Sequence, residues 1–303
     1  MTSRSDRPLP DGDRRPVRQR TLLLIDEDEG WCEILRHWLT GHGYRVVVAT
    51  DGVAGLQLAR TTRPAAVILD VLLPKITGAK LCWLLRQDPA LRHTPIIVCS
   101  ALSPRDFAWF PELSADAYVA KGRLPGPGEN LLRALRGVTT APPDVLHHGI
   151  LGFEVLQPHR LVRELLAERA RLYTLVACLE PSALEVDGEG VIVLATPAAC
   201  QMLGRLEVHL LGEKLQELCP ADEQPRMAAR IAGVARRNKS ARIPMQLCGR
   251  DFTLALARIE VDGGAGSVLV LLEPSAGRPC ADASPAGCLP APTAVVSPTP
   301  EAA

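Results

Sequence analysis

Short apolar runs alternate with longer amphipathic stretches along the first half of the chain. The stretches between the runs carry apolar residues at helical spacing, for example Trp31, Ile34, Leu35 and Trp38. Strands that are buried on both faces show continuous apolar runs, and parallel strands need helical crossovers. The pattern therefore predicts an α/β fold with a doubly wound, five-stranded parallel sheet. The expected strands are Thr21–Ile25, Arg45–Ala49, Ala65–Leu69, Pro95–Cys99 and Ala117–Ala120.

Helices are expected between these runs and after the last one. Glycine or proline follows most of them, as expected at helix ends. The expected helices are Glu29–Leu39, Gly52–Thr61, Ala79–Arg86, a short one from Pro104 toward Glu112, and Glu129–Gly137.

Polar residues stand directly behind four of the five apolar runs. They are the pair Asp26-Glu27, then Asp70, Ser100 and Lys121. In an open parallel sheet, ligands bind beyond the carboxyl ends of the strands, so these side chains should meet at one edge. Carboxylates, a hydroxyl and an ammonium group are suited to hold a divalent cation and a phosphoryl group.

The segments that carry these residues resemble the receiver domain of two-component response regulators. The matching segments are Leu22–Asp28, Leu69–Gly78, Pro95–Ala101 and Ala117–Lys121, in the family's order. The resemblance covers roughly Arg20 to Val138 and implies a flavodoxin-like receiver domain at residues 20–138.

The resemblance also implies a role for each residue of the motif. Asp70 would be the phosphoacceptor, supplied by a sensor histidine kinase or a phosphotransfer protein. Mg²⁺ would be held by Asp26, Glu27, Asp70 and the backbone carbonyl of Leu72. Lys121 would contact a phosphoryl oxygen, Ser100 would donate a hydrogen bond to the attached phosphoryl group, and Tyr118 would act as the switch residue.

Two positions depart from the family pattern. Glu27 stands where the family more often has a second Asp, and its extra methylene would move the metal ligand. Gly122 follows the lysine where the family usually has Pro, so the usual cis peptide is not expected there. An alternative interpretation is therefore a degenerate receiver within a scaffold that works without phosphorylation.

Residues 139–180 read as a linker followed by a signalling helix. The stretch up to Pro158 is rich in Pro, His and Gly, which marks a boundary. From 159 to 179, leucines recur at heptad-like spacing, which is typical of a helix that pairs with its copy in a homodimer. A helix that packs against its own domain would show the same pattern.

Residues 181–274 form a second predicted domain. A hairpin (Ala183–Val186 and Val191–Ala195) is followed by helices, the longer from Asp222 to about Arg237. Three strands are expected after them, at Ala241–Cys248, Phe252–Val261 and Ser267–Glu273. This order and the segment Asp187–Ala199 resemble a PAS domain, which implies an α+β fold with an antiparallel sheet. Cys200 and His209 are expected to pack rather than to bind a cofactor.

Composition narrows the class of protein. The formal net charge of the chain is +0, its hydrophobic content is 47%, and no run of uncharged apolar residues is long enough to span a bilayer. The nine cysteines are scattered, which suggests a reducing cytosol and a cytoplasmic protein.

The tails at 1–19 and 275–303 are expected to be disordered. A DNA-binding regulator that uses the Arg-rich N-terminus is a further alternative, although nucleic acid is not an expected partner.

No sequence motif of a kinase, a phosphodiesterase or a helix-turn-helix follows the receiver-like segment. The output is therefore expected to be non-enzymatic, through an unidentified downstream protein. The sequence predicts a response regulator of a phosphorelay, phosphorylated on an aspartate, that relays its signal through a PAS-like interaction or sensory module.

Overall fold

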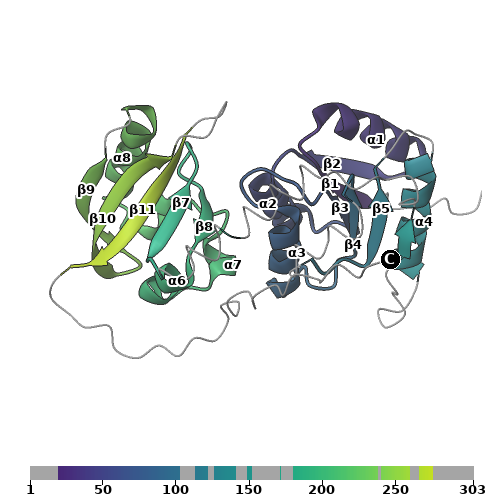
Figure 1. The fold of residues 1–303 in the computed structure, drawn as a ribbon. Coiled ribbons are helices and arrows are strands. Elements are labelled where there is room, and N and C mark those ends of the chain that lie inside the picture. The colour runs from purple at the N-terminus through teal and green to yellow at the C-terminus, as the bar shows by residue number, and fades with distance from the viewer. Residues whose placement is uncertain are drawn as a thin grey trace, which may run out of the picture.

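The structure is a computed structural model that describes residues 20–102, 113–121, 126–140, 149–151, 171, 180–237, 240–259 and 266–275. Within these residues the chain forms two sheets. A six-stranded sheet has the order β2-β1-β3-β4-β5-β6, and a five-stranded sheet has the order β8-β7-β11-β10-β9. Figure 1 shows them as two domains, the first built on the six-stranded sheet and the second on the five-stranded one.

The first domain confirms the five predicted parallel strands. Each pairs with its neighbours in parallel register, and three of them (β1, β3 and β4) are buried along almost their whole length, which explains why their sequences are continuous apolar runs. The strands are β1 (Thr21–Ile25), β2 (Arg45–Ala49), β3 (Ala66–Leu69), β4 (Ile96–Ser100) and β5 (Ala117–Ala120).

Helices cover both faces of this sheet. The helices α1 (Glu29–Gly41) and α4 (Gly126–Thr140) share one hydrophobic cluster with residues such as Leu22 and Leu24. The helices α2 (Gly52–Thr62) and α3 (Gly78–Gln87) pack on the opposite face, against Leu23 and Ile25. The predicted doubly wound arrangement is thus present.

Side-chain caps begin three of these helices. Asp28 accepts a hydrogen bond from the Trp31 amide, Asp51 from the Ala54 amide, and Thr77 from the Lys80 amide. Each cap satisfies one of the amides that have no partner within the helix. These caps fix where each helix starts relative to the strand before it.

The prediction of five strands was incomplete, because a sixth strand joins the sheet. The strand β6 (Gly149–Leu151) pairs in parallel with β5 and comes from the segment that was predicted to be a linker. It occupies the edge that β5 would otherwise expose to solvent. Three residues are too few to show strand periodicity in a sequence.

Several predicted segments lie outside the described residues. They are the helix from Pro104 toward Glu112, the two tails at 1–19 and 276–303, position Gly122, and the helix 159–179 apart from Arg171. Among the residues that the structure describes, no helix combines the length and the apolar character needed to cross a membrane.

The second domain is an antiparallel sheet with helices on one face. Its strands are β7 (Ala183–Val186), β8 (Ile192–Ala195), β9 (Ala241–Leu247), β10 (Arg250–Ile259) and β11 (Ser267–Pro274), which confirms the predicted hairpin and the three later strands. The helices are α6 (Pro197–Leu203), α7 (Glu207–Leu210), the 3₁₀ helix η4 (Leu215–Leu218) and α8 (Gln224–Arg237).

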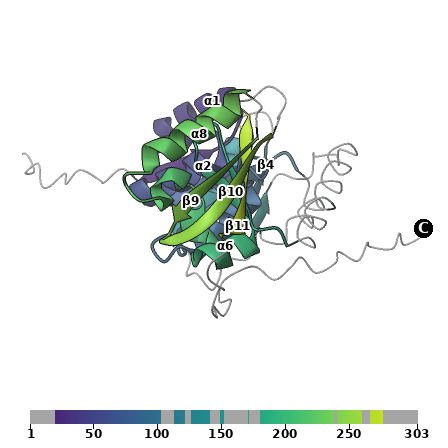
Figure 2. The ribbon, with the colours of Figure 1, turned by 90° about the vertical axis from the view of Figure 1, so that its left-hand side faces the viewer.

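Burial alternates along the strands of the second domain, as expected when only one face is covered. In β11, Val268, Val270 and Leu272 are buried and the residues between them are half-buried. The helix α8 supplies Met227 and Ile231 to the same core. Figure 2 shows α8 beside the long strands β9 and β10.

Candidate functional site

The parallel register brings the predicted polar residues to one edge of the first sheet. Ile25 of β1 is opposite Leu69 of β3, so the residues that follow them, Asp26 and Asp70, leave neighbouring strands at the same level. The Asp70 amide also donates to the Ile25 carbonyl, at 3.0 Å. On β4 and β5 the Lys121 amide donates to the Ser100 carbonyl, at 2.9 Å. The sheet geometry therefore aligns four polar positions, as predicted.

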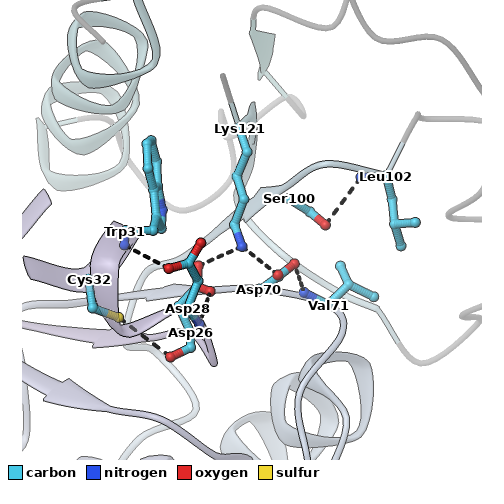
Figure 3. Close-up of polar contacts among 9 residues, drawn as sticks. All are labelled: Asp26, Asp28, Trp31, Cys32, Asp70, Val71, Ser100, Leu102 and Lys121. Atoms are coloured by element: carbon cyan, nitrogen blue, oxygen red, sulfur yellow. Dashed lines mark hydrogen bonds and ion pairs between the residues drawn. The ribbon is translucent and has the colours of Figure 1, made fainter. Parts of the chain in front are cut away.

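The Lys121 ammonium group joins the two carboxylates. Its Nζ atom lies 2.7 Å from Asp26 Oδ2 and 2.6 Å from Asp70 Oδ2 (Figure 3). Asp26 is only 1% exposed and Asp70 7%. Two buried carboxylates thus share a single ammonium, which leaves the cluster with one excess negative charge when both are ionised.

Burial and charge act in opposite directions on these groups. Burial raises the pKa of Asp26, and the contact with Lys121 only partly offsets this effect. Burial alone would lower the pKa of Lys121, but the charges of Asp70 and Asp26 raise it overall. Lys121 is therefore a permanent cation at neutral pH, while Asp26 carries its charge at a cost.

Backbone amides complete the surroundings of the two carboxylates. The Val71 amide donates to Asp70 Oδ1 at 2.6 Å, and the Asp28 amide donates to Asp26 Oδ1 at 3.1 Å. These donors were missed from the sequence, because any residue at those positions supplies an amide. As a result, both oxygens of Asp70 have a donor in the structure.

The structure brings only part of the predicted metal-binding set together. Asp26 and Asp70 meet, while the side chain of Glu27 is exposed beside them and Leu72 is half-buried. Within the described ranges, no group of three or more His, Cys, Asp or Glu side chains is arranged to hold a metal ion. Oxygen donors from two buried carboxylates with excess negative charge nevertheless suit a hard divalent cation.

The two predicted switch residues lie on neighbouring strands. The Ser100 hydroxyl is buried and accepts a hydrogen bond from the Leu102 amide at 3.3 Å. The Tyr118 ring is half-buried, and its hydroxyl donates to the Leu113 carbonyl at 3.5 Å. Burial raises the pKa of the Tyr118 hydroxyl, so it stays protonated at neutral pH.

A buried thiol lies close to this cluster. Cys32 Sγ is 3.4 Å from the Asp26 carbonyl oxygen, and burial, together with the charge of Asp26, raises its pKa to about 12. A thiol with such a pKa is not a nucleophile at neutral pH. Cys32 is therefore expected to pack rather than to react.

Comparison with known proteins identifies the domain that holds this site. Residues 22–134 match the response regulator receiver domain family. The transcriptional regulatory protein PhoP for alkaline phosphatase synthesis, from Bacillus subtilis, is 35% identical over 103 residues, which are 34% of this chain and 42% of PhoP. The DNA-binding response regulator MtrA of Mycolicibacterium smegmatis is 33% identical over 150 residues, 49% of this chain and 64% of MtrA.

Among solved structures, a putative response regulator from Chloroflexus aurantiacus is 33% identical to this chain. The match covers 41% of this chain and 99% of the chain in that structure, with a TM-score of 0.36. The chain spans 42% of the length of PhoP and 64% of MtrA. Residues 22–134 are thus a response regulator receiver domain, and the relatives that share it include a transcriptional regulatory protein and a DNA-binding response regulator.

Proposed function

We propose that this chain is a response regulator in which Asp70 accepts a phosphoryl group and the second domain relays the change. The observation that carries the proposal is the Lys121 ammonium, held between the buried carboxylates of Asp26 and Asp70. A carboxylate can attack a phosphoryl group only where nearby positive charge offsets the repulsion between anions. Lys121 supplies that charge next to the attacking group.

The chemistry is a phosphoryl transfer to a carboxylate oxygen of Asp70. With a phosphohistidine donor, a new bond from that oxygen to phosphorus forms while the bond from phosphorus to the imidazole nitrogen breaks, and the imidazole keeps the electron pair and takes up a proton. The donor would be a sensor histidine kinase or a phosphotransfer protein. Lys121 would hold a phosphoryl oxygen as a point charge.

The same cluster fits a magnesium ion, because its excess negative charge and its oxygen donors match the preferences of Mg²⁺. Asp26 and Asp70 would bind the ion, with the exposed Glu27 and the Leu72 carbonyl as the further predicted ligands. When bound, the ion would neutralise charge on the transferring phosphoryl group.

Ser100 and Tyr118 are the proposed readout of the attached phosphoryl group. The Ser100 hydroxyl lies on the strand next to Asp70 and would exchange its contact with the Leu102 amide for a phosphoryl oxygen. Tyr118 would then turn further into the interior. A doubly charged group at Asp70 is in this way converted into repacking of the surface around β4 and β5.

The second domain is proposed to be a PAS-like module for protein interaction or sensing. Its strand order β8-β7-β11-β10-β9, with its helices inserted between the second and third strands of the domain, supports this assignment. Cys200 is buried, in keeping with a packing role, whereas the side chain of His209 lies at the surface. We further propose a cytoplasmic protein whose output is the binding of a downstream protein rather than catalysis.

Intact-mass measurement after incubation with acetyl phosphate and magnesium tests the proposal. The wild-type chain should gain the mass of one phosphoryl group, and Asp70→Asn should gain none. Lys121→Ala should retain part of the labelling but lose the conformational response. A wild-type chain that stays unlabelled, under conditions that label another receiver domain, would favour the scaffold that works without phosphorylation.

A further inference from the structure

The helices α2 and α3 of the receiver domain face the second domain (Figure 1). Four receiver side chains reach across with hydrogen bonds or ion pairs. The contacts are Gln57 Nε2 to the Gly212 carbonyl at 2.9 Å, Arg60 Nη2 to the Val208 carbonyl at 2.6 Å, Lys75 Nζ to Asp187 Oδ2 at 3.1 Å, and Lys80 Nζ to Glu207 Oε2 at 2.6 Å.

The two surfaces are complementary in charge. The receiver contributes cations, and the second domain contributes carboxylates and the backbone carbonyl of Val208 in α7. The pair of Lys80 and Glu207 is only 22% and 14% exposed, so solvent screens it less than a surface pair. These contacts therefore define one arrangement of the two domains.

The Lys75 ammonium group forms ion pairs with a carboxylate of each domain. Its Nζ atom lies 3.0 Å from Asp51 Oδ2 at the start of α2 and 3.1 Å from Asp187 Oδ2 in the turn between β7 and β8. The second oxygen of each carboxylate is engaged locally, by the Ala54 amide for Asp51 and by two turn amides for Asp187. Lys75 therefore lies between two fixed anions.

The loop that carries Lys75 begins at the phosphoacceptor. The Gly78 amide donates to the Val71 carbonyl at 2.9 Å, and the Gly52 amide donates to the Pro74 carbonyl at 3.2 Å. A Cβ atom at Gly78 would lie 1.9 Å from the Asp70 carbonyl oxygen, so the two ends of the loop are in tight contact. Lys75 has a φ of 63°, a strained value for a residue with a side chain.

We propose that the ion pair of Lys75 and Asp187 couples the phosphoacceptor loop to the docking of the second domain, so that the docked domain opposes occupation of the Asp70 pocket. The coupling rests on the proposed function of Asp70. Both Asp70 oxygens already have donors, Lys121 and the Val71 amide, so an attached phosphoryl group must displace at least one contact. The Val71 amide belongs to the loop that docking holds in place.

Linkage makes this coupling measurable from either side. If docking stabilises the resting loop, weakening the docking should make occupation of the pocket easier. The probe is beryllofluoride with magnesium, titrated into the full chain. Asp187→Asn removes the charge that holds Lys75 but keeps an oxygen acceptor for the amides of the turn. Its affinity for beryllofluoride should rise about fivefold or more above that of the wild type.

Two further variants sharpen the test. Glu207→Gln removes the partner of Lys80, which lies on α3 outside the loop, and should raise the affinity in the same direction. Glu273→Gln is the matched control, because Glu273 pairs with Arg242 within the second domain and should leave the affinity at the wild-type value. Hydrogen exchange of the turn between β7 and β8 should increase when beryllofluoride binds to the wild type.

The outcomes separate this proposal from the proposed function. If the wild type binds beryllofluoride while both interface variants keep its affinity, or bind more weakly, the coupling is wrong and the function stands. If the wild type does not bind beryllofluoride at all, the proposed function fails and the coupling fails with it.

Discussion

Two lysines of this chain each join a pair of aspartates, in contrasting surroundings. Lys121 bridges Asp26 and Asp70 inside the receiver domain, where the lysine is 17% exposed and Asp26 1%. Lys75 bridges Asp51 and Asp187 between the domains and is 37% exposed. The chemical groups are the same, so the two clusters can be compared by their burial and by their place within or between the domains.

The two clusters differ in how far their charged groups are removed from solvent. The carboxylates around Lys121 have lost solvent, which raises the pKa of Asp26 and leaves charge that a cation or a phosphoryl transfer can use. Around Lys75, the lysine is 37% exposed while Asp51 and Asp187 are only 18% and 12% exposed, so hydration is kept mainly at the ammonium group. In the proposed account, phosphoryl transfer uses the buried charges around Lys121, and release of the domains uses the more exposed Lys75.

The largest expected effect is that of removing the Lys121 cation from the two buried carboxylates. Lys121→Met leaves two buried carboxylates without a counter-charge, and we expect a loss of about 3 kcal/mol in the free energy of unfolding at neutral pH. Urea denaturation measures it. A loss no larger than that of Lys75→Met would show that burial does not distinguish the two clusters.

Replacing Asp26 should raise the stability of the fold and abolish its phosphorylation. The pKa of Asp26 is raised above its ordinary value of 3.8, so the folded state binds more protons than the unfolded state in the range above that value. The free energy of unfolding therefore falls as pH rises through this range. Asp26→Asn should remove this fall, stabilise the fold at neutral pH by on the order of 1 kcal/mol, and abolish magnesium-dependent labelling.

Urea midpoints measured over a pH series, together with intact-mass labelling, check both parts of this prediction. A variant that is labelled at the wild-type rate would contradict the role of Asp26. A variant with an unchanged dependence of stability on pH would contradict its costly burial.

Lys75→Met should have a smaller effect on stability. Its pair with Asp187 is partly solvated, and we expect a loss of less than about 1 kcal/mol after allowance for screening. Added salt should reduce the difference between wild type and variant, because it screens exposed charges. Denaturation at low and high salt measures this, and a loss that does not depend on salt would point to packing of the lysine side chain instead.

The smallest effect is expected at the exposed pair of Glu33 and Arg36 on α1. Its two side chains are 66% and 46% exposed. Glu33→Gln should leave the urea midpoint at the wild-type value, because solvent replaces the lost contact. A clear shift of the midpoint would mean that exposure is a poor guide to the strength of ion pairs in this protein.

The sequence predicted those features that depend on continuous patterns. The five parallel strands follow from apolar runs, and the meeting of Asp26, Asp70 and Lys121 follows from their positions behind those runs. The strands of the second domain were predicted from apolar segments and turns, and their antiparallel sheet from the resemblance to a PAS domain. These features depend on local spacing and on the rule that the carboxyl ends of parallel strands meet at one edge of the sheet.

Features that depend on contacts between distant segments were not predicted. The strand β6 is too short to leave a pattern, and the Val71 amide carries no side-chain signature. Lys75 and Asp187 read as ordinary loop residues, because only the docking of the domains brings them together. The exposed position of Glu27 also depends on how the chain leaves β1.

The central claim is that Asp70 receives the phosphoryl group, and chemical mapping of the product tests it most directly. The full-length chain is labelled with acetyl phosphate and magnesium, the acyl phosphate is reduced with borohydride, and the modified residue is located by peptide mass spectrometry. We predict reduction of residue 70 to homoserine, and none in a sample treated first with hydroxylamine. Modification at another carboxylate, or at none, would contradict the account.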